Sequence, residues 1–287
     1  MYKLDGKNAV VTGASKGFGE LLSYELASRG AHVIGVARSE NLLEDLQKKI
    51  GKERFSYISG DLGQKTSIKD VMKAIYEKYN GAEIMAFNAG MFEIKPVEDV
   101  EDEDKAESLM NINQLSPIRT FGYWLKEYKD GFRKPEIAFW LGSVSSLRSW
   151  AGGDVYQATK SGIAAFAYAR RIIDKGKIRH IVAYPGTTET EMTREYKGAK
   201  IPKEIVVNEL LKSLEGKDEY GRYDDIAITI PEEDPVLSVD KLNALSNEEK
   251  KSIYTVFYPT DENTNRPNIQ EAKLHKLAGP ERVIKSE

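Results

Sequence analysis

The sequence contains no cysteine, and its three histidines, His32, His180 and His275, lie far apart along the chain. Disulfide bonds, thiolate metal sites and a cysteine nucleophile are therefore excluded, and the histidine spacing matches no zinc motif. Any catalysis must use other side chains, and we expect no metal ion.

Long apolar runs and a strong charge of one sign are also missing. No segment approaches the ~18 apolar residues of a membrane span, and Met1 to Val11 contains no apolar signal core. The net charge is −3, from 42 basic and 45 acidic residues that are interspersed. Because no basic patch favours nucleic acid or an anionic membrane, we predict a cytoplasmic protein that binds neither.

Between residues 8 and 183, short β-branched runs alternate with longer amphipathic segments. This alternation is typical of a parallel sheet covered by helices on both faces. We predict a doubly wound, Rossmann-type α/β fold with the usual strand order 3-2-1-4-5-6 and a candidate seventh strand at Ile226–Ile230. The first six predicted strands are Ala9–Thr12, His32–Val36, Phe55–Ile58, Ile84–Phe87, Ile137–Leu141 and Ile181–Ala183.

The predicted helices follow from apolar residues that recur at helical spacing. The first carries an apolar stripe from Phe18 to Leu26 and has Gly30 just past its end. Pro117 should bend the helix that contains it, because proline removes one backbone hydrogen bond. Further helices are predicted at Ser67–Tyr79, about Ser108–Tyr128, Thr159–Ile173 and Pro202–Leu214.

The pattern divides the chain into two parts. Residues 1–230 are predicted to form one dinucleotide-binding and catalytic domain, which includes a substrate-side segment at 190–215. Residues 231–287 are polar and interrupted by prolines. We expect a partly irregular extension there, either packed on the same domain or mobile.

A glycine-rich stretch, Thr12 to Gly19 (TGASKGFG), joins the first predicted strand to the first helix. Glycines at this place let the backbone turn tightly and approach a pyrophosphate, whose charge meets the free N–H groups of the helix N-terminus. Alone, the stretch is compatible with an ordinary helix-entry turn, but its place in a βαβ unit favours a dinucleotide. The predicted cofactor contacts are Gly13, Ser15, Lys16, Gly17, Phe18 and Gly19.

The end of the second strand indicates which dinucleotide is preferred. NAD-binding chains place an Asp or Glu there for the ribose 2′-OH, whereas this chain has Ala37 followed by Arg38. The planar guanidinium of Arg38 can form two parallel hydrogen bonds to a 2′-phosphate, and the ammonium of Lys16 can attract the same phosphate by its charge. We predict NADP(H). Glu40 leaves NAD(H) as an alternative, and Lys16 and Arg38 could also be ordinary solvated surface residues.

Tyr156 and Lys160 are four residues apart and therefore share one helix face. This spacing is weak evidence by itself, because Tyr196 and Lys200 repeat it. A positioned phenol is a suitable acid for a carbonyl that accepts hydride, and a neighbouring ammonium favours the phenolate in the reverse direction. Ser143, at the end of a strand, can donate to the substrate oxygen, although a serine there is often only a turn residue.

In order and spacing, these motifs resemble the short-chain dehydrogenase/reductase family over about residues 5 to 190. The resemblance implies Ser143, Tyr156 and Lys160 as catalytic residues and Asn113 as the holder of a water that links Lys160 to solvent. It also implies a homodimer or homotetramer built on the two long helices before and after Ser143. The further cofactor contacts that it implies are Asp61, Leu62, Asn88, Ala89, Gly90, Tyr156, Lys160, Pro185, Gly186, Thr188 and Thr190.

The chain departs from the family pattern in three places. Phe87 replaces the Asn that often precedes Asn-Ala-Gly, and the glycine pair common near the last strand is missing. Roughly ninety residues after Thr190 match no motif. Because this segment usually folds over the substrate, it implies an unusual substrate, a lid or a subunit contact.

The substrate pocket should open at the carboxyl ends of the strands. Its predicted walls are apolar or aromatic, so we expect a small carbonyl or alcohol substrate with an apolar portion, although such residues can equally be ordinary packing. The predicted wall residues are Met91, Phe92, Ser145, Leu147, Trp150 and Tyr184.

The leading functional prediction is an NADPH-dependent carbonyl reductase or alcohol dehydrogenase. One alternative is an NADP(H)-binding sensor or scaffold without turnover, which would have no need of the acid Tyr156. Another is an epimerase or dehydratase of the same superfamily, which would usually have a different glycine spacing.

Overall fold

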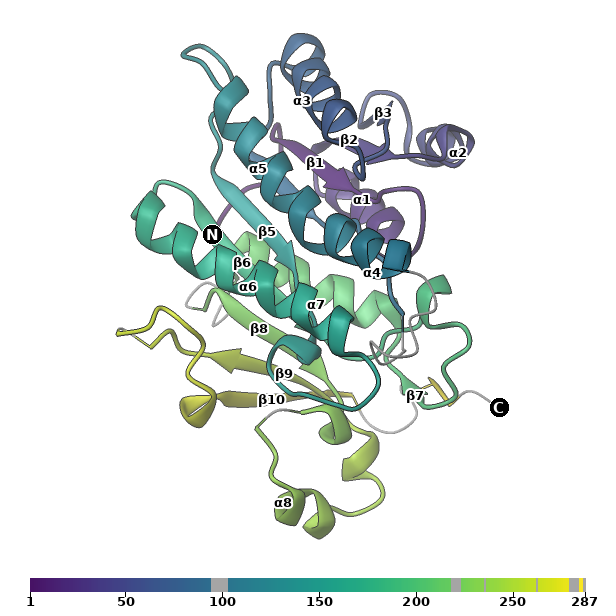
Figure 1. Cartoon of the computed structure of the whole chain (residues 1–287), viewed down its shortest axis with the longest axis vertical. Helices are drawn as coiled ribbons and strands as arrows, with labels where there is room; N and C mark the ends of the chain where they lie inside the picture. The colour runs from purple at the N-terminus through teal and green to yellow at the C-terminus, as the bar shows by residue number, and fades with distance from the viewer. Residues whose placement is uncertain (94–102, 218–222, 235, 262, 279–283, 286–287) are drawn as a thin grey trace.

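The computed structural model describes residues 1–93, 103–217, 223–234, 236–261, 263–278 and 284–285. Figure 1 shows one large sheet with helices on both sides. Within the described residues the sheet has nine strands in the order β10-β9-β8-β6-β5-β4-β1-β2-β3. These strands are β1 (Asn8–Thr12), β2 (His32–Ala37), β3 (Phe55–Ser59), β4 (Ile84–Phe87), β5 (Ile137–Leu141), β6 (Arg179–Pro185), β8 (Asp225–Thr229), β9 (Ile253–Tyr258) and β10 (Lys273–Ala278).

The part of the sheet from β3 to β8 is parallel throughout. This confirms the predicted doubly wound fold and its strand order, with β8 as the seventh strand. Parallel strands are buried on both faces, which explains their nearly continuous apolar sequences. All their carboxyl ends lie at one edge of the sheet, where the polar motifs of the sequence are gathered.

The helices form one layer on each face of the sheet. One apolar layer joins the sheet to α1 (Gly17–Ser28), α2 (Glu40–Ile50) and α7 (Lys203–Glu215). The opposite layer joins it to α3 (Lys65–Tyr79), α5 (Ser116–Glu127) and α6 (Asp154–Asp174). None of the helices in the described part of the chain has the length and apolar character needed to cross a membrane.

The segment predicted as one helix bent at Pro117 consists of three parts. α4 (Glu103–Met110) leads into a π-helical turn at Asn111–Leu115, and α5 follows with Pro117 in its first turn. Proline is tolerated there because the N–H groups of a first turn have no intrahelical acceptor. The carbonyl of Asn113 thereby lacks its regular α-helical donor, which would have been the N–H of residue 117. Single π-helical turns of this kind often mark functional sites.

Two regions differ from the sequence-based predictions. A helix that was not predicted, α2, lies between β2 and β3 and buries Leu43 and Leu46. No strand was predicted after residue 230, but β9 pairs antiparallel with both β8 and β10. The C-terminal part of the chain thus extends the central sheet, and its Ile284–Lys285 (β11) pairs with Ala199–Lys200 (β7) in a separate small sheet.

Candidate active site

A cavity of about 830 Å³ opens at the carboxyl edge of the parallel strands. Its walls come from the loops after β1, β2, β3, β4, β5 and β6, together with the start of α6 and the segment after β8. Crevices at this edge of open α/β sheets are the usual ligand sites. The lining includes all the catalytic residues predicted from the sequence except Asn113, which lies directly behind it.

The glycine loop is held tightly under the cavity. Gly13 and Gly17 have φ angles of +69° and +57°, which suit glycine. The Asn88 side chain donates to the carbonyl of Thr12 at 2.9 Å and so ties the loop to the end of β4. A Cβ at Gly19 would lie 2.1 Å from the carbonyl oxygen of Gly13. The loop therefore requires a residue without a side chain at position 19. Close approach of the backbone to a pyrophosphate has the same requirement.

Replacing Gly19 with Ala should weaken NADPH binding by at least about tenfold, because the methyl group forces the loop away from its close approach to the helix. A displacement of this kind costs about 1–3 kcal/mol where packing cannot yield. Titration of the variant with NADPH measures the loss. Gly122→Ala is a suitable control, because a Cβ there meets nothing within 4 Å. Unchanged affinity in Gly19→Ala would contradict a role for the loop.

Two exposed cations border the end of the cavity formed by the glycine loop and the loops after β2 and β3. Lys16 and Arg38 both line it, and neither forms an ion pair with another described residue. Asp61 and Leu62 line the same end, with Asp61 held by a bond from the N–H of Gly63 at 2.9 Å. The donor set fits a dinucleotide that carries an extra phosphate, since two cations are free to meet it.

Tyr156, Ser143 and Lys160 converge at the other end. Tyr156 and Lys160 lie on α6, and the ammonium of Lys160 is 5.8 Å from the centre of the Tyr156 ring. Burial raises the pKa of Tyr156 to about 12, although a hydrogen bond with the Ser143 side chain works in the opposite direction. The phenol is therefore protonated at neutral pH and able to donate a proton.

Lys160 is buried together with Tyr156. Its ammonium donates to the carbonyl of Leu141 at 2.9 Å, and burial lowers its pKa to about 8. The lowered pKa leaves Lys160 mostly charged at pH 7, so its charge lies beside the phenol in a site sheltered from water.

Asn113 is fixed by the loop that follows β4. Its side-chain oxygen accepts from the N–H of Met91 at 2.7 Å, and its side-chain nitrogen donates to the carbonyl of Met91 at 2.8 Å. The side chain is thus engaged within the protein. Any water held by Asn113 would bind its backbone carbonyl, which the π-helical turn and Pro117 leave without the usual donor.

The cavity carries an apolar rim near Tyr156. Met91, Met192 and Tyr196 are 40%, 48% and 39% exposed and all line the cavity. Phe92 packs edge-on against Tyr156 with ring centres 4.8 Å apart. Trp150 donates from its indole nitrogen to the Ser145 hydroxyl at 2.9 Å, which places both at the same wall.

Two predicted wall residues lie elsewhere. Tyr184 is completely buried in the core, where its hydroxyl donates to Asp225 at 2.9 Å, because its side chain points to the helix face of β6 rather than past its end. Leu147 packs against the same apolar layer and does not line the cavity. The predicted placement of both is therefore corrected.

Several residues at the cavity were not named individually from the sequence. Tyr196 lies in the predicted substrate-side segment, but it was singled out only as part of a second Tyr–Lys pair. It lines the rim, while its partner Lys200 lies on β7 and donates to the carbonyl of Arg194. Glu232 and Glu233 also line the cavity. Their position directly after the predicted seventh strand was the signal that could have located them, since ligands bind at strand ends.

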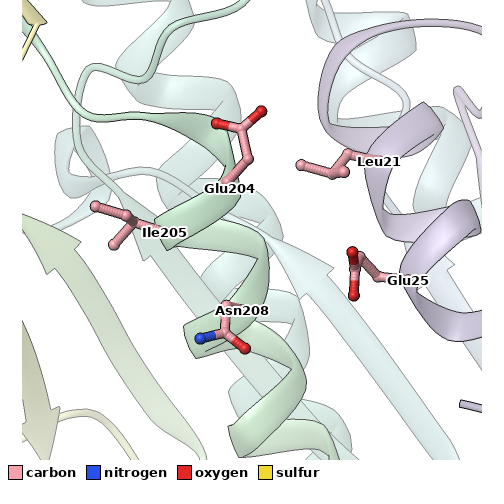
Figure 2. A pocket seen from close by; sticks show the side chains of 5 residues that line it. All are labelled: Leu21, Glu25, Glu204, Ile205 and Asn208. Atoms are coloured by element: carbon pink, nitrogen blue, oxygen red, sulfur yellow. The ribbon is translucent and has the colours of Figure 1, made fainter. Parts of the chain in front are cut away.

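A second hollow of about 320 Å³ lies on the outer side of the molecule, between α1 and α7. Figure 2 shows its five lining side chains, with the carboxylates of Glu25 and Glu204 on opposite helices. It shares no residue with the large cavity, and Glu25 is paired with Arg29. We assign it no catalytic role.

Comparison with known proteins locates the chain among dehydrogenases. A family model described as short chain dehydrogenase matches residues 7–200. The 3-oxoacyl-(acyl-carrier-protein) reductase FabG of Vibrio cholerae is 32% identical over 197 residues, which cover 67% of this chain and 77% of that protein. The 11-beta-hydroxysteroid dehydrogenase-like 4A of Arabidopsis thaliana is 28% identical over 200 residues, which cover 67% of this chain but only 64% of that protein.

Solved structures share the fold. An alcohol dehydrogenase from the archaeon Thermococcus sibiricus, complexed with 5-hydroxy-NADP, has a TM-score of 0.68 at 23% identity and covers 77% of this chain and 95% of its own. A 3-ketoacyl-(acyl-carrier-protein) reductase from Brucella melitensis, complexed with NADH, has a TM-score of 0.61 at 23% identity and covers 66% of this chain and 79% of its own. At these identities the likeness concerns the fold.

Proposed function

Since this chain belongs to the short-chain dehydrogenase/reductase family of oxidoreductases, we propose that it is an NADP(H)-dependent enzyme that interconverts a ketone and a secondary alcohol. The observation that carries the proposal is the convergence of Tyr156, Ser143 and Lys160 in the wall of the cavity that the glycine loop also lines. A nicotinamide cofactor, when bound, supplies or accepts the hydride.

Residues along the cavity, from the glycine loop to the loop after β6, would hold the cofactor. The backbone of Gly13 to Gly19 would bind the pyrophosphate at the N-terminus of α1. Arg38 and Lys16 would bind the 2′-phosphate of NADP(H), and Ala37 places no carboxylate there to repel it. The remaining contacts are Ser15, Phe18, Asp61, Leu62, Asn88, Ala89, Gly90, Pro185, Gly186, Thr188 and Thr190.

The protein moves the proton. Tyr156 donates from its phenol to the substrate oxygen as negative charge develops there, and its raised pKa keeps it protonated for this step. Ser143 donates a hydrogen bond to the same oxygen, an interaction commonly worth about 3 kcal/mol for a well-placed donor. Lys160 stabilises the phenolate that remains, and its charge favours that phenolate in the reverse, alcohol-oxidising direction.

The apolar rim supports a substrate with an apolar portion. Met91, Met192 and Tyr196 expose apolar surface toward the cavity, and Trp150 closes one side. Burying such surface is the principal source of affinity for apolar ligands. The functional unit in this proposal is a homodimer or homotetramer, in keeping with a family that is typically oligomeric, and its cytoplasmic location stays a prediction.

The intact proton-donating site favours turnover over the alternatives. A sensor that only binds NADP(H) has no use for a buried phenol beside a buried ammonium. Removing such an ammonium from water costs free energy. The glycine spacing is that of simple reductases rather than of the longer epimerases and dehydratases. We therefore retain the reductase as the single proposed function.

Consumption of NADPH against a panel of ketones, 3-oxoacyl thioesters and quinones tests the proposal. We expect at least one apolar ketone or 3-oxoacyl compound to be reduced to its secondary alcohol, with the alcohol identified by product analysis. Tight NADPH binding without consumption by any member of a broad panel would support the sensor instead. Product formed without net consumption of NADPH would support an epimerase.

A further inference from the structure

A carboxylate from the segment after β8 reaches the loop after β6. The two strands are parallel neighbours, with Pro185 opposite Ile228, so both end at the same edge. After β8 the chain makes a single 3₁₀ turn at Pro231–Glu233, in which the N–H of Glu233 donates to the carbonyl of Ile230 at 2.9 Å. This turn brings Glu233 beside the residues that follow Pro185.

Glu233 holds Thr187 with both of its carboxylate oxygens. One oxygen accepts from the backbone N–H of Thr187 at 2.7 Å, and the other accepts from the Thr187 hydroxyl. On its opposite side, the carbonyl of Thr187 accepts from the N–H of Ile201 at 2.9 Å. All polar groups of Thr187 are therefore engaged, and the loop is anchored from two directions.

Gly186 permits this close approach. A Cβ at this position would lie 2.3 Å from the nearer carboxylate oxygen of Glu233. The missing Cβ at Gly186 thus leaves room for the Glu233 carboxylate beside the loop. One of the two bonds is made to the backbone N–H of Thr187, so the contact acts on the main chain of the loop.

The Glu233 carboxylate has no ion-pair partner among the described residues. Burial raises its pKa, while its bonds from Thr187 act against that rise. A largely buried carboxylate without a salt bridge contributes poorly to stability, so its place at a ligand cavity points to a role in the site. Glu233 lines the same cavity as Tyr156 and Thr188.

Resting on the proposed function, we propose that Glu233 is a positioning residue for the cofactor: by fixing Thr187 it holds the loop Gly186–Thr190 in the shape that receives the nicotinamide half. Its effect should be confined to that half, because the adenosine half lies at the glycine loop and Arg38, at the other end of the cavity. The segment that follows β8 thereby becomes part of the cofactor site.

The test compares two ligands in three variants. NADPH reports on both halves of the site, whereas adenosine 2′,5′-bisphosphate lacks the nicotinamide half and reports on the adenosine end alone. Glu233→Ala should weaken NADPH by about 10- to 100-fold, the size expected for losing hydrogen bonds to a charged group. The bisphosphate should bind within about twofold of wild type.

Two further variants separate the hydrogen bonds from other effects. Glu233→Gln keeps an oxygen that can accept from the N–H of Thr187, so it should restore most of the NADPH affinity. Glu248→Ala removes an exposed carboxylate that does not line the cavity, and it should bind both ligands normally. If Glu233→Ala does not fold, Thr187→Val provides the second variant, with a smaller loss for NADPH alone.

Three results would overturn the proposal: unchanged NADPH affinity in Glu233→Ala or Thr187→Val, equal losses for both ligands, or a Glu233→Gln variant as impaired as the alanine variant. The proposed function fails separately: the wild-type protein would then bind neither NADPH nor the bisphosphate, or would bind NADPH without reducing any member of the substrate panel. Thermal unfolding of each variant, recorded without ligand, shows whether a loss of affinity reflects the loop or the whole fold.

Discussion

Tyr156→Phe is expected to lower the rate of carbonyl reduction by about 10²- to 10⁴-fold, the usual contribution of a positioned general acid. The variant removes only the hydroxyl, so the ring keeps its edge-on contact with Phe92 and the fold is preserved. NADPH affinity should stay within about twofold of wild type. Steady-state reduction kinetics and NADPH titration measure the two effects separately.

Tyr196→Phe is the matched control for this experiment. Tyr196 lines the same cavity and also stands four residues before a lysine, but it lies at the rim and Lys200 is on a strand. The Tyr196 hydroxyl is not positioned beside Ser143, so turnover of the Tyr196→Phe variant should change by less than about threefold. Retained turnover in Tyr156→Phe, or equal losses in both variants, would remove the assignment of Tyr156 as the acid.

Arg38→Asp is expected to weaken NADPH binding by about 100-fold and to leave NADH affinity unchanged or improved. The variant removes a charge-assisted bond to the 2′-phosphate and introduces a carboxylate that repels it, while the same carboxylate can accept from the 2′-OH of NADH. Titration with both cofactors gives the ratio of affinities directly.

Lys52→Asp is a control with the same change in net charge. Lys52 is exposed and does not line the cavity, so its variant should bind both cofactors as wild type does. If Arg38→Asp bound NADPH with unchanged affinity, Arg38 would be an ordinary surface cation and the preference for NADP(H) would lose its main support.

Much of the parallel sheet could be predicted from the sequence because its signals are local. A buried strand such as Ile84–Phe87 is apolar throughout and is followed at once by a polar turn, so both of its ends are marked. The glycine loop is also recognised from its own short sequence, although the atoms nearest to Gly13 and Gly17 belong to the distant residues Ala89 and Thr190. The motif residues then gathered at the strand ends, as parallel pairing requires.

Contacts between distant segments could not be predicted in this way. β9 contains the apolar run Ile253–Tyr258, but its place beside β8 depends on pairing rather than on its own sequence. Tyr184 follows the alternation of β6, so one position along the strand decides between the cavity and the core. Glu233 reaches Thr187 only because β6 and β8 are neighbours, although they are separated by α7 in the chain.

A crystal structure of the protein with NADP⁺ bound would show whether the cofactor and the catalytic side chains meet. We expect a nicotinamide ring beside Tyr156, Ser143 and the loop after β6. The carbonyl carbon of a bound substrate could then lie about 3–3.5 Å from the reactive carbon of the nicotinamide ring. Its oxygen would be within hydrogen-bond reach of Tyr156 and Ser143. A nicotinamide ring bound on the far side of the glycine loop, turned toward solvent, or out of reach of the Tyr156 oxygen would contradict this expected arrangement.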